Sequence, residues 1–257
     1  MTEVLIQASG ISVQFGGLMA VKEVDVQVKT GEILGVIGPN GAGKSTFLNV
    51  LTGLQRPSQG SLQVKGQKIT DLKAWKMAKS GVARSFQTIR LLEDLNVLDN
   101  LLIGGHLYAK KNFFDVLART NSLRRTEQQL KHEALNTLSW LGLGDKANEL
   151  AAKLSLEERR RVEIARALMT RPDVLLLDEP CAGFNPNESL KLSDVILAIR
   201  DRGISVVLVE HNVKMVMSLA DRIVVLDHGE KLVEGTPDEV SKNEAVIKAY
   251  LGSEVHA

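Results

Sequence analysis

Gly38-Pro39-Asn40-Gly41-Ala42-Gly43-Lys44-Ser45-Thr46 is the stretch of sequence that decides the fold. A continuous apolar run at residues 33–37 precedes it, and a largely apolar segment at 47–51 follows it. The pattern G-x-x-x-x-G-K-S between a buried strand and a helix is typical of a phosphate-binding loop. Glycines let backbone N–H groups turn toward phosphates, and the following helix presents its positive N-terminus. The stretch therefore predicts a nucleoside-triphosphate site, in which Lys44 reaches the β and γ phosphates and Ser45 holds Mg²⁺.

Hydrophobic patterns on either side of this loop predict an α/β fold. Val24, Val26 and Val28 alternate with polar residues, the period-2 pattern of a half-buried antiparallel strand within residues 1–30. Continuous apolar runs at 33–37, 174–177, 206–209 and 223–226 are typical of parallel strands that are covered on both faces. A helical run with an apolar face follows Asn185-Pro186, a good N-cap and N1 pair. Strands that alternate with helices in this way predict a parallel sheet.

Residues 97–165 carry a different pattern. Strand signals vanish there, and Leu123, Leu130, Ala134, Leu138 and Leu141 follow helical spacing. We therefore expect a single domain over residues 1–257, with an α/β core at 1–96 and 166–257 and an inserted helical subdomain at 97–165. A chain of 257 residues is long enough for such an arrangement.

Polar side chains follow two of the predicted parallel strands. Asp178 and Glu179 come at the end of one apolar run, and His211 follows another. Ligands of open parallel sheets bind at the carboxyl ends of the strands. One carboxylate there can bind Mg²⁺ and the adjacent one can orient an attacking water, while a histidine on the next strand is a candidate sensor of the γ-phosphate. The plainer alternatives are an acidic turn and a structural histidine.

The bulk composition excludes several classes of protein. The 32 basic and 31 acidic residues give a net charge of +1, which leaves no basic field and predicts no nucleic-acid partner. The single cysteine excludes an internal disulfide framework and suits a reducing compartment. No apolar stretch approaches the roughly 18–20 residues that span a bilayer. We therefore expect a cytoplasmic protein whose link to a membrane runs through a partner.

Several motifs together resemble the ATP-binding subunits of ABC transporters, over about residues 4–252. The resemblance implies a P-loop ATPase with a RecA-like parallel sheet, an N-terminal antiparallel β region and an inserted helical subdomain. Gly38–Thr46 resembles Walker A, and 175–179 resembles Walker B. Further matches are the A-loop at Phe15-Gly16-Gly17, the glutamine loop at 85–88, the signature region from 154, the D-loop at 182–186 and the switch histidine at 210–212.

The resemblance implies a role for each matched residue. Phe15 would stack on adenine, Glu179 would polarise the water and His211 would hold the γ-phosphate. Mg²⁺ would be surrounded by Ser45, Gln87 and Asp178, and the segment from Gln87 to Leu95 would lie where a permease docks. The full set of expected ATP-binding residues is Phe15, Gly38, Pro39, Asn40, Gly41, Ala42, Gly43, Lys44, Ser45, Thr46, Gln87 and Asp178.

Strings at 82–87, 182–186, 209–212 and 249–252 are similar to the importer ATPases for branched-chain amino acids. Relatives that move urea or lipopolysaccharide look alike over much of the chain. The implied partners are membrane permease subunits, a second ATPase subunit (identical or different) and a substrate-binding protein. The implied location is peripheral, at the cytoplasmic face of the inner membrane.

The signature segment departs from the family pattern. Where relatives carry Leu-Ser-Gly-Gly-Gln, this chain has Leu154 followed by Ser155, Leu156, Glu157 and Glu158. In the family, this segment closes over ATP that is held by the other subunit, and a carboxylate there would repel the triphosphate. Ser155 and Glu158 also form a predicted capping box, which would fill the helix start with the chain's own side chains.

Two interpretations of the departure stay open at this stage. Either the half-site is degenerate, or Glu157 swings into solvent, helped by Arg159, Arg160 and Arg161, and function is nearly normal. The first interpretation admits a regulatory subunit that does not hydrolyse ATP, although Lys44, Asp178, Glu179 and His211 argue against it. A soluble ABC ATPase that acts on DNA or ribosomes is disfavoured, because such chains usually carry two ATPase halves or a long coiled coil.

Overall fold

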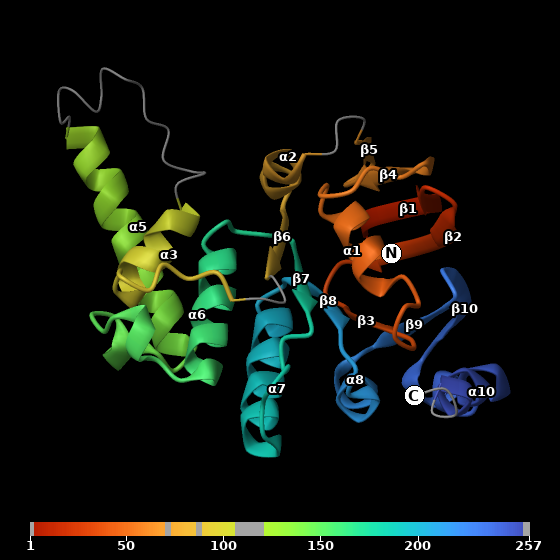
Figure 1. The fold of residues 1–257 in the computed structure, drawn as a ribbon. Helices are drawn as coiled ribbons and strands as arrows, with labels where there is room; N and C mark the ends of the chain where they lie inside the picture. The colour runs from red at the N-terminus through yellow and green to blue at the C-terminus, as the bar shows by residue number, and fades with distance from the viewer. Residues whose placement is uncertain (1–2, 70–72, 86–88, 106–120, 254–257) are drawn as a thin grey trace.

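The computed structural model describes residues 3–69, 73–85, 89–105 and 121–253. These residues form two sheets and the helices around them (Figure 1). The strands are β1 Val4–Phe15, β2 Leu18–Lys29, β3 Ile33–Ile37, β4 Gln59–Val64, β5 Gln67–Lys68, β6 Val82–Ser85, β7 Val174–Asp178, β8 Ser205–Val209, β9 Arg222–Asp227 and β10 Glu230–Gly235. The helices are α1 Lys44–Leu51, α2 Ala74–Lys79, α3 Val97–Gly105, α5 Asn121–Trp140, α6 Leu156–Leu168, α7 Pro186–Asp201, α8 Val213–Leu219, α9 Pro237–Ser241 and α10 Glu244–Ser253, with short 3₁₀ turns at Gly144–Lys146 and Ala151–Lys153.

The larger sheet has the strand order β10-β9-β3-β8-β7-β6. Pairing is parallel throughout except between β9 and β10, as the continuous apolar runs predict. Val36 pairs with Val209 of β8, and Val209 pairs with Asp178 of β7. The chain therefore leaves β3, β7 and β8 at the same edge, which brings the phosphate loop, the two carboxylates and His211 together.

The smaller sheet has the order β2-β1-β4-β5 and is antiparallel, which confirms the expected antiparallel region. It covers one face of the parallel sheet, with α1 between them. The alternation predicted for β2 is confirmed, since Val24, Val26 and Val28 are buried and the residues between them are exposed. This core also contains Phe47 of α1 and Leu176 of β7.

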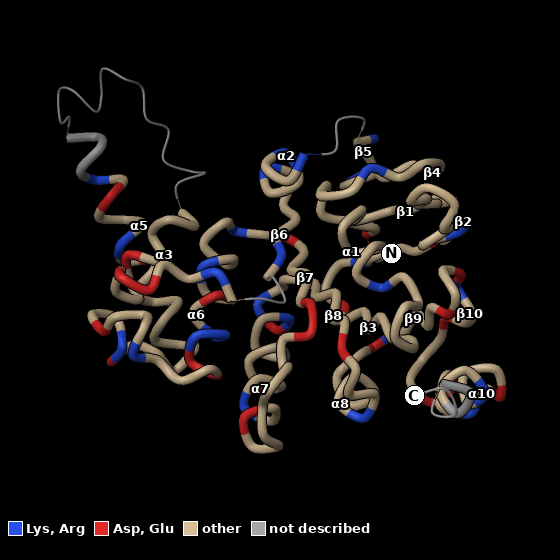
Figure 2. The backbone as a smooth tube through the Cα atoms, in the orientation of Figure 1, with Lys and Arg blue, Asp and Glu red and all other residues tan. Residues whose placement is uncertain are grey.

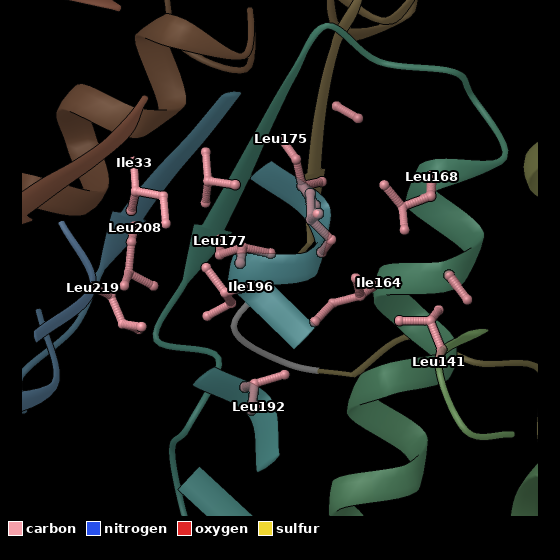
Figure 3. Packing of buried hydrophobic residues seen from close by; sticks show 14 of the residues in the cluster. Ile33, Leu141, Ile164, Leu168, Leu175, Leu177, Leu192, Ile196, Leu208 and Leu219 are labelled. Atoms are coloured by element: carbon pink, nitrogen blue, oxygen red, sulfur yellow. The ribbon is translucent and has the colours of Figure 1, made fainter. Parts of the chain in front are cut away.

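The opposite face of the parallel sheet packs against α6, α7 and α8. Figure 3 shows Leu175, Leu177 and Leu208 of the sheet facing Ile196 of α7 and Ile164 of α6. Asn185 caps α7 as predicted, because its side chain accepts a hydrogen bond from the Glu188 amide while the Glu188 carboxylate accepts one from the Asn185 amide. The parallel strands are thus buried on both faces. This packing fixes the positions of the residues at the carboxyl ends of the strands.

Helices α3, α5 and α6 gather on the side of the molecule away from the small sheet (Figure 1). The helix that the apolar spacing predicts is present as α5, and its predicted apolar positions Leu130, Ala134 and Leu138 are buried. Helix α6 continues past the expected boundary at residue 165 and ends at Leu168. The division into core and subdomain therefore stays a prediction.

Acidic and basic residues are interspersed along most of the described elements (Figure 2). This distribution agrees with the near-neutral charge of the sequence. Among the described residues, no helix is both long and apolar enough to cross a bilayer.

Candidate nucleotide-binding site

The phosphate loop connects β3 to α1, and two of its glycines are required by close contacts. Gly38 has φ 153°, and a Cβ there would lie 2.1 Å from the carbonyl oxygen of Leu226. Gly43 has φ 93° and caps α1, and a Cβ there would lie 2.4 Å from the carbonyl oxygen of Ala20. Because any larger residue would collide with backbone at these points, the loop keeps the tight path that exposes its amides.

Lys44 is the first residue of α1 and is 5% exposed. Its Nζ donates hydrogen bonds to the carbonyl oxygens of Gly38 at 2.7 Å and Pro39 at 2.9 Å. Burial lowers the pKa of Lys44, and the nearby charges of Glu179 and Asp178 act in the opposite direction. The loop carbonyls thus hold the ammonium group close to where phosphates would bind, and it can turn from them to a phosphate oxygen.

A cavity of about 710 Å³ lies beside the loop. It combines apolar side chains from the turn between β1 and β2 with the polar atoms of the loop and of the strand ends. Such a mixed lining suits a ligand with an apolar ring at one end and charge at the other. The lining residues are Phe15, Leu18, Met19, Ala20, Asn40, Gly41, Ala42, Gly43, Lys44, Ser45, Thr46, Glu179, His211 and His228.

Glu179 and His211 are in direct contact in the lining of this cavity. Glu179 Oε1 lies 2.6 Å from His211 Nε2, although β7 and β8 reach this point from distant parts of the chain. The backbone of Glu179 adopts φ 47°, an uncommon conformation for a non-glycine residue, and its amide donates to the Val209 carbonyl at 2.8 Å. The left-handed turn directs the carboxylate toward the phosphate loop rather than along the strand.

Asp178 lies behind the cavity and is 2% exposed. Its Oδ2 accepts a hydrogen bond from Arg84 at 2.6 Å. Its buried Oδ1 has no hydrogen-bond partner among the described residues. An oxygen of this kind is a suitable ligand for Mg²⁺ or for a water of its coordination shell. Within the described ranges, no group of three or more His, Cys, Asp or Glu residues is arranged to hold a metal ion.

A second buried carboxylate supports the strand ends. Glu210 is 4% exposed, and its Oε1 accepts a hydrogen bond from the Cys181 amide at 2.7 Å. Burial raises the pKa of Glu210 and raises that of the Cys181 thiol to about 12. The thiol therefore stays protonated at neutral pH, and Cys181 has a packing role beside the loop that follows Glu179.

The signature segment begins α6 and does not line this cavity. The predicted capping box is present, because Glu158 Oε2 accepts from the Ser155 amide at 2.8 Å and Ser155 Oγ accepts from the Glu158 amide at 3.2 Å. The hydrogen bond from the Ser155 amide lowers the pKa of Glu158 most strongly, so this carboxylate is charged at neutral pH. Leu156 is 47% exposed and lies against Gly183 of the D-loop.

Glu157 is not in solvent, which corrects the second interpretation of the signature. It is 5% exposed, and its carboxylate binds Arg161 at 2.6 Å and 2.8 Å. The two residues lie one helical turn apart on α6, so the pair forms within the helix. Arg160 instead pairs with Glu163, and Arg159 binds the Leu154 and Ala152 carbonyls and Glu93. Because Arg161 pairs with Glu157, this carboxylate repels an approaching phosphate less than the sequence suggests, and the partly exposed Glu158, with Lys146 Nζ at 3.8 Å, is the other acidic group at the helix start.

The predicted site residues divide into three groups. Phe15, residues 40–46, Glu179 and His211 line one cavity, while Gly38, Pro39 and Asp178 support it from behind. Ser155, Leu156, Glu157 and Glu158 lie elsewhere, and Gln87 lies outside the described residues. Sequence reasoning missed the contributions of Leu18, Met19, Ala20, His228 and Arg84, since only folding brings their elements to the loop.

Comparison with known proteins agrees with this geometry. The family described as ABC transporter matches residues 21–182. The chain is a member of the ABC transporter family. The family described as branched-chain amino acid ATP-binding cassette transporter matches residues 230–256 of this ABC-family chain.

Curated relatives match this ABC-family chain over nearly its whole length. It is 41% identical to the high-affinity branched-chain amino acid transport ATP-binding protein BraF of Pseudomonas aeruginosa, over 98% of this chain and 99% of that protein. It is 40% identical to the protein of the same description, LivG, of Escherichia coli K12, with the same coverage. A crystal structure of an ABC transporter cassette in its ADP conformation superposes with a TM-score of 0.85 at 29% identity, covering 98% of this chain and all of that one.

Proposed function

We propose that the chain binds and hydrolyses MgATP and thereby drives a membrane permease that imports branched-chain amino acids. The observation that carries the proposal is the contact between Glu179 and His211 in the cavity of the phosphate loop, at 2.6 Å. This contact places a carboxylate that can orient a water molecule next to the residues that bind the phosphates. The described relatives, which transport branched-chain amino acids, support the cargo.

In the proposed reaction a water molecule attacks the γ-phosphorus, the bond to the β–γ bridging oxygen breaks, and ADP and phosphate leave. Lys44 and the loop amides bind the phosphates, and Phe15 stacks on adenine. Glu179 accepts a hydrogen bond from the water and aligns it, while His211 holds the carboxylate and contacts the γ-phosphate. Ser45, Asp178 and Gln87 are the residues that would hold Mg²⁺, which neutralises charge on the phosphate oxygens.

The assembly follows from the same proposal. The chain pairs with a second ATPase subunit and lies peripherally at the cytoplasmic face of the inner membrane, beneath permease subunits that a substrate-binding protein supplies. Within the chain, 1–96 and 166–257 form the nucleotide-binding core and 97–165 the helical subdomain. A groove of about 280 Å³ between them is lined by Leu54, Ala78, Arg84, Ile103 and Arg166, among others, and offers a place for a permease segment.

Transport in vesicles tests the cargo. The chain is isolated with the membrane proteins that co-purify with it and is reconstituted in proteoliposomes that contain the binding protein and enclosed MgATP. We expect uptake of labelled leucine, isoleucine or valine and no uptake of urea. Urea uptake, or extraction of lipopolysaccharide, would replace the cargo and leave the ATPase proposal intact. Co-purification with DNA or ribosomes in place of membrane proteins would overturn the transport proposal.

A second candidate function is that of a catalytically impaired regulatory partner. The start of α6 favours it, because Glu158 already occupies the Ser155 amide and keeps a negative charge at the helix N-terminus. In this proposal the segment attracts the ATP of the other subunit weakly. A complex with a different second subunit would then keep one composite site, made of this chain's Walker A and the partner's signature.

Two variants measure this effect in the assembled ATPase. Glu157→Gly restores the second glycine of the family pattern, and we expect higher ATP affinity and a higher hydrolysis rate. It also leaves Arg161 without its buried partner, so we expect a loss of about 2–4 kcal/mol in the free energy of unfolding. Glu158→Gln removes charge but retains a capping side chain. We expect this variant to raise ATP affinity by about threefold to tenfold, with a smaller loss of stability than Glu157→Gly, since the lowered pKa of Glu158 means that its charge stabilises the folded chain. Unchanged affinity and rate in both variants would contradict the degenerate half-site.

A further inference from the structure

Arg84 connects the metal-binding carboxylate to the helix that follows the phosphate loop. It lies on β6, next to β7 in the parallel sheet, and its side chain is 9% exposed. One terminal nitrogen, NH2, donates to Asp178 Oδ2 at 2.6 Å. The other, NH1, donates to Asn49 Oδ1 of α1 at 2.6 Å and lies 3.4 Å from Thr52 Oγ1. The guanidinium is therefore held from two sides, by the sheet and by α1.

Because of this contact, the two carboxylate oxygens of Asp178 have different surroundings. Oδ2 is taken by Arg84, whereas Oδ1 is buried and has no hydrogen-bond partner within the described part of the chain. A buried carboxylate without a counter-charge costs several kcal/mol. Arginine is always charged, so it compensates Asp178 at every physiological pH. The second anchor on Asn49 keeps the guanidinium in place when another cation approaches.

The charges around the site are balanced by this arginine. Asp178 and Glu179 are the two carboxylates that act on the pKa of Lys44, which places all three within electrostatic range of each other, whereas Glu210 lies on the far side of Glu179, against Cys181 and His211. Lys44 and Arg84 supply two positive charges against these two negative ones. A cluster with no net charge attracts a divalent cation weakly. Loss of Arg84 would leave the cluster with a net negative charge.

We propose that Arg84 is the resident counter-ion of the metal site, and that it makes Mg²⁺ binding depend on the phosphates of the nucleotide. It holds Asp178 by Oδ2, leaves Oδ1 for the metal or its water, and cancels the charge that would otherwise attract Mg²⁺ to the empty protein. The metal then enters only with the negative charge of ATP. This inference rests on the proposed function, and it assigns a positioning role to a residue that does not line the nucleotide cavity.

The test measures metal binding without nucleotide. Mn²⁺, a paramagnetic substitute for Mg²⁺, is titrated into the purified chain and the free ion is followed by electron paramagnetic resonance. We expect Arg84→Gln to bind Mn²⁺ at one site at least about tenfold more tightly than the unchanged chain. We also expect Arg84→Gln to lower the melting temperature, and millimolar Mg²⁺ to restore much of the loss. Asp178→Asn added to Arg84→Gln should abolish both metal responses.

A second buried ion pair supplies the matched control. Arg160 and Glu163 are exposed by only 3% and 2%, close to the values of Arg84 and Asp178, and lie on α6. Arg160→Gln should lower the melting temperature, and Mg²⁺ should not restore it. If Arg84→Gln responds to metal no more than Arg160→Gln does, the counter-ion role is wrong.

A conservative variant covers a failure of Arg84→Gln to fold. Arg84→Lys keeps the charge, and we expect it to bind Mn²⁺ as weakly as the unchanged chain; tight binding would contradict the proposal. Isothermal titration of the unchanged chain with MgATP distinguishes a failure of the proposed ATPase function from a failure of the counter-ion role of Arg84. No binding of MgATP there would overturn the proposed function itself, whereas normal binding with no metal response in Arg84→Gln would overturn only the role of Arg84.

Discussion

Glu179→Gln is expected to stop ATP hydrolysis while the chain continues to bind MgATP. The carboxylate lies in the cavity of the phosphate loop, 2.6 Å from His211, and its backbone conformation directs it there. Glutamine has nearly the same shape and can still accept a hydrogen bond from His211, so the site keeps its geometry. It is a far weaker base, and loss of a general base typically costs about 10²–10⁴ in rate.

The measurement compares steady-state phosphate release with MgATP affinity in the assembled transporter. Glu188→Gln is the matched control, because Glu188 lies in the first turn of the following helix and a glutamine there keeps the capping box with Asn185. The control should retain its hydrolysis rate. A Glu179→Gln protein that hydrolyses ATP at the normal rate would remove Glu179 from the mechanism. No hydrolysis by the unchanged assembly would favour the regulatory function.

Lys44→Met is expected to lose MgATP binding without a loss of fold. Lys44 is the cation that the loop holds over the phosphate position, with hydrogen bonds to the Gly38 and Pro39 carbonyls. A hydrogen bond between charged groups contributes about 1.5–3 kcal/mol, and the lysine can make more than one to the phosphates, so the affinity should fall by about 100-fold. Because burial lowers the pKa of Lys44, its charge is held at a cost in the folded chain. A neutral side chain of similar length removes that cost.

Titration calorimetry and thermal unfolding distinguish the two effects. We expect the melting temperature of Lys44→Met to stay close to that of the unchanged chain while the heat of MgATP binding disappears. Lys65→Met, which breaks an exposed pair with Asp173, should bind MgATP normally. Undiminished MgATP affinity in Lys44→Met would remove the basis of the nucleotide site.

The sequence was sufficient for those features that depend on local pattern. The strand and helix on either side of residues 38–43, the other buried strands and the capping residues Asn185 and Ser155 are all fixed by neighbours within a few positions, and each is confirmed. Their order along a parallel sheet also predicts that Glu179 and His211 meet, because strand carboxyl ends share an edge. The family resemblance added Phe15 at the end of β1, but not Leu18, Met19 or Ala20 at the start of β2.

Contacts between distant elements could not be predicted in the same way. Arg84 reaches Asp178 only because β6 pairs with β7, and His228 reaches the cavity only because β9 pairs with β3. The orientation of the Glu157 side chain could not be predicted either. Its position in the first turn of α6 permits both a solvent-exposed side chain and a pair with Arg161. The buried helix environment favours the pair.

The place of β3 in the sheet has a consequence for how the chain matures on the ribosome. This strand carries the phosphate loop, yet its two neighbours, β8 and β9, come from the last quarter of the chain. The Leu226 carbonyl that abuts Gly38 lies near the end of β9, and the Gly229 amide that donates to the Ala42 carbonyl at 3.2 Å follows it. A nascent chain therefore exposes its ATP-binding motif early but lacks the walls that shape it. We therefore expect nucleotide capture to be one of the final events of biosynthesis, so that unfinished polypeptides bind little ATP.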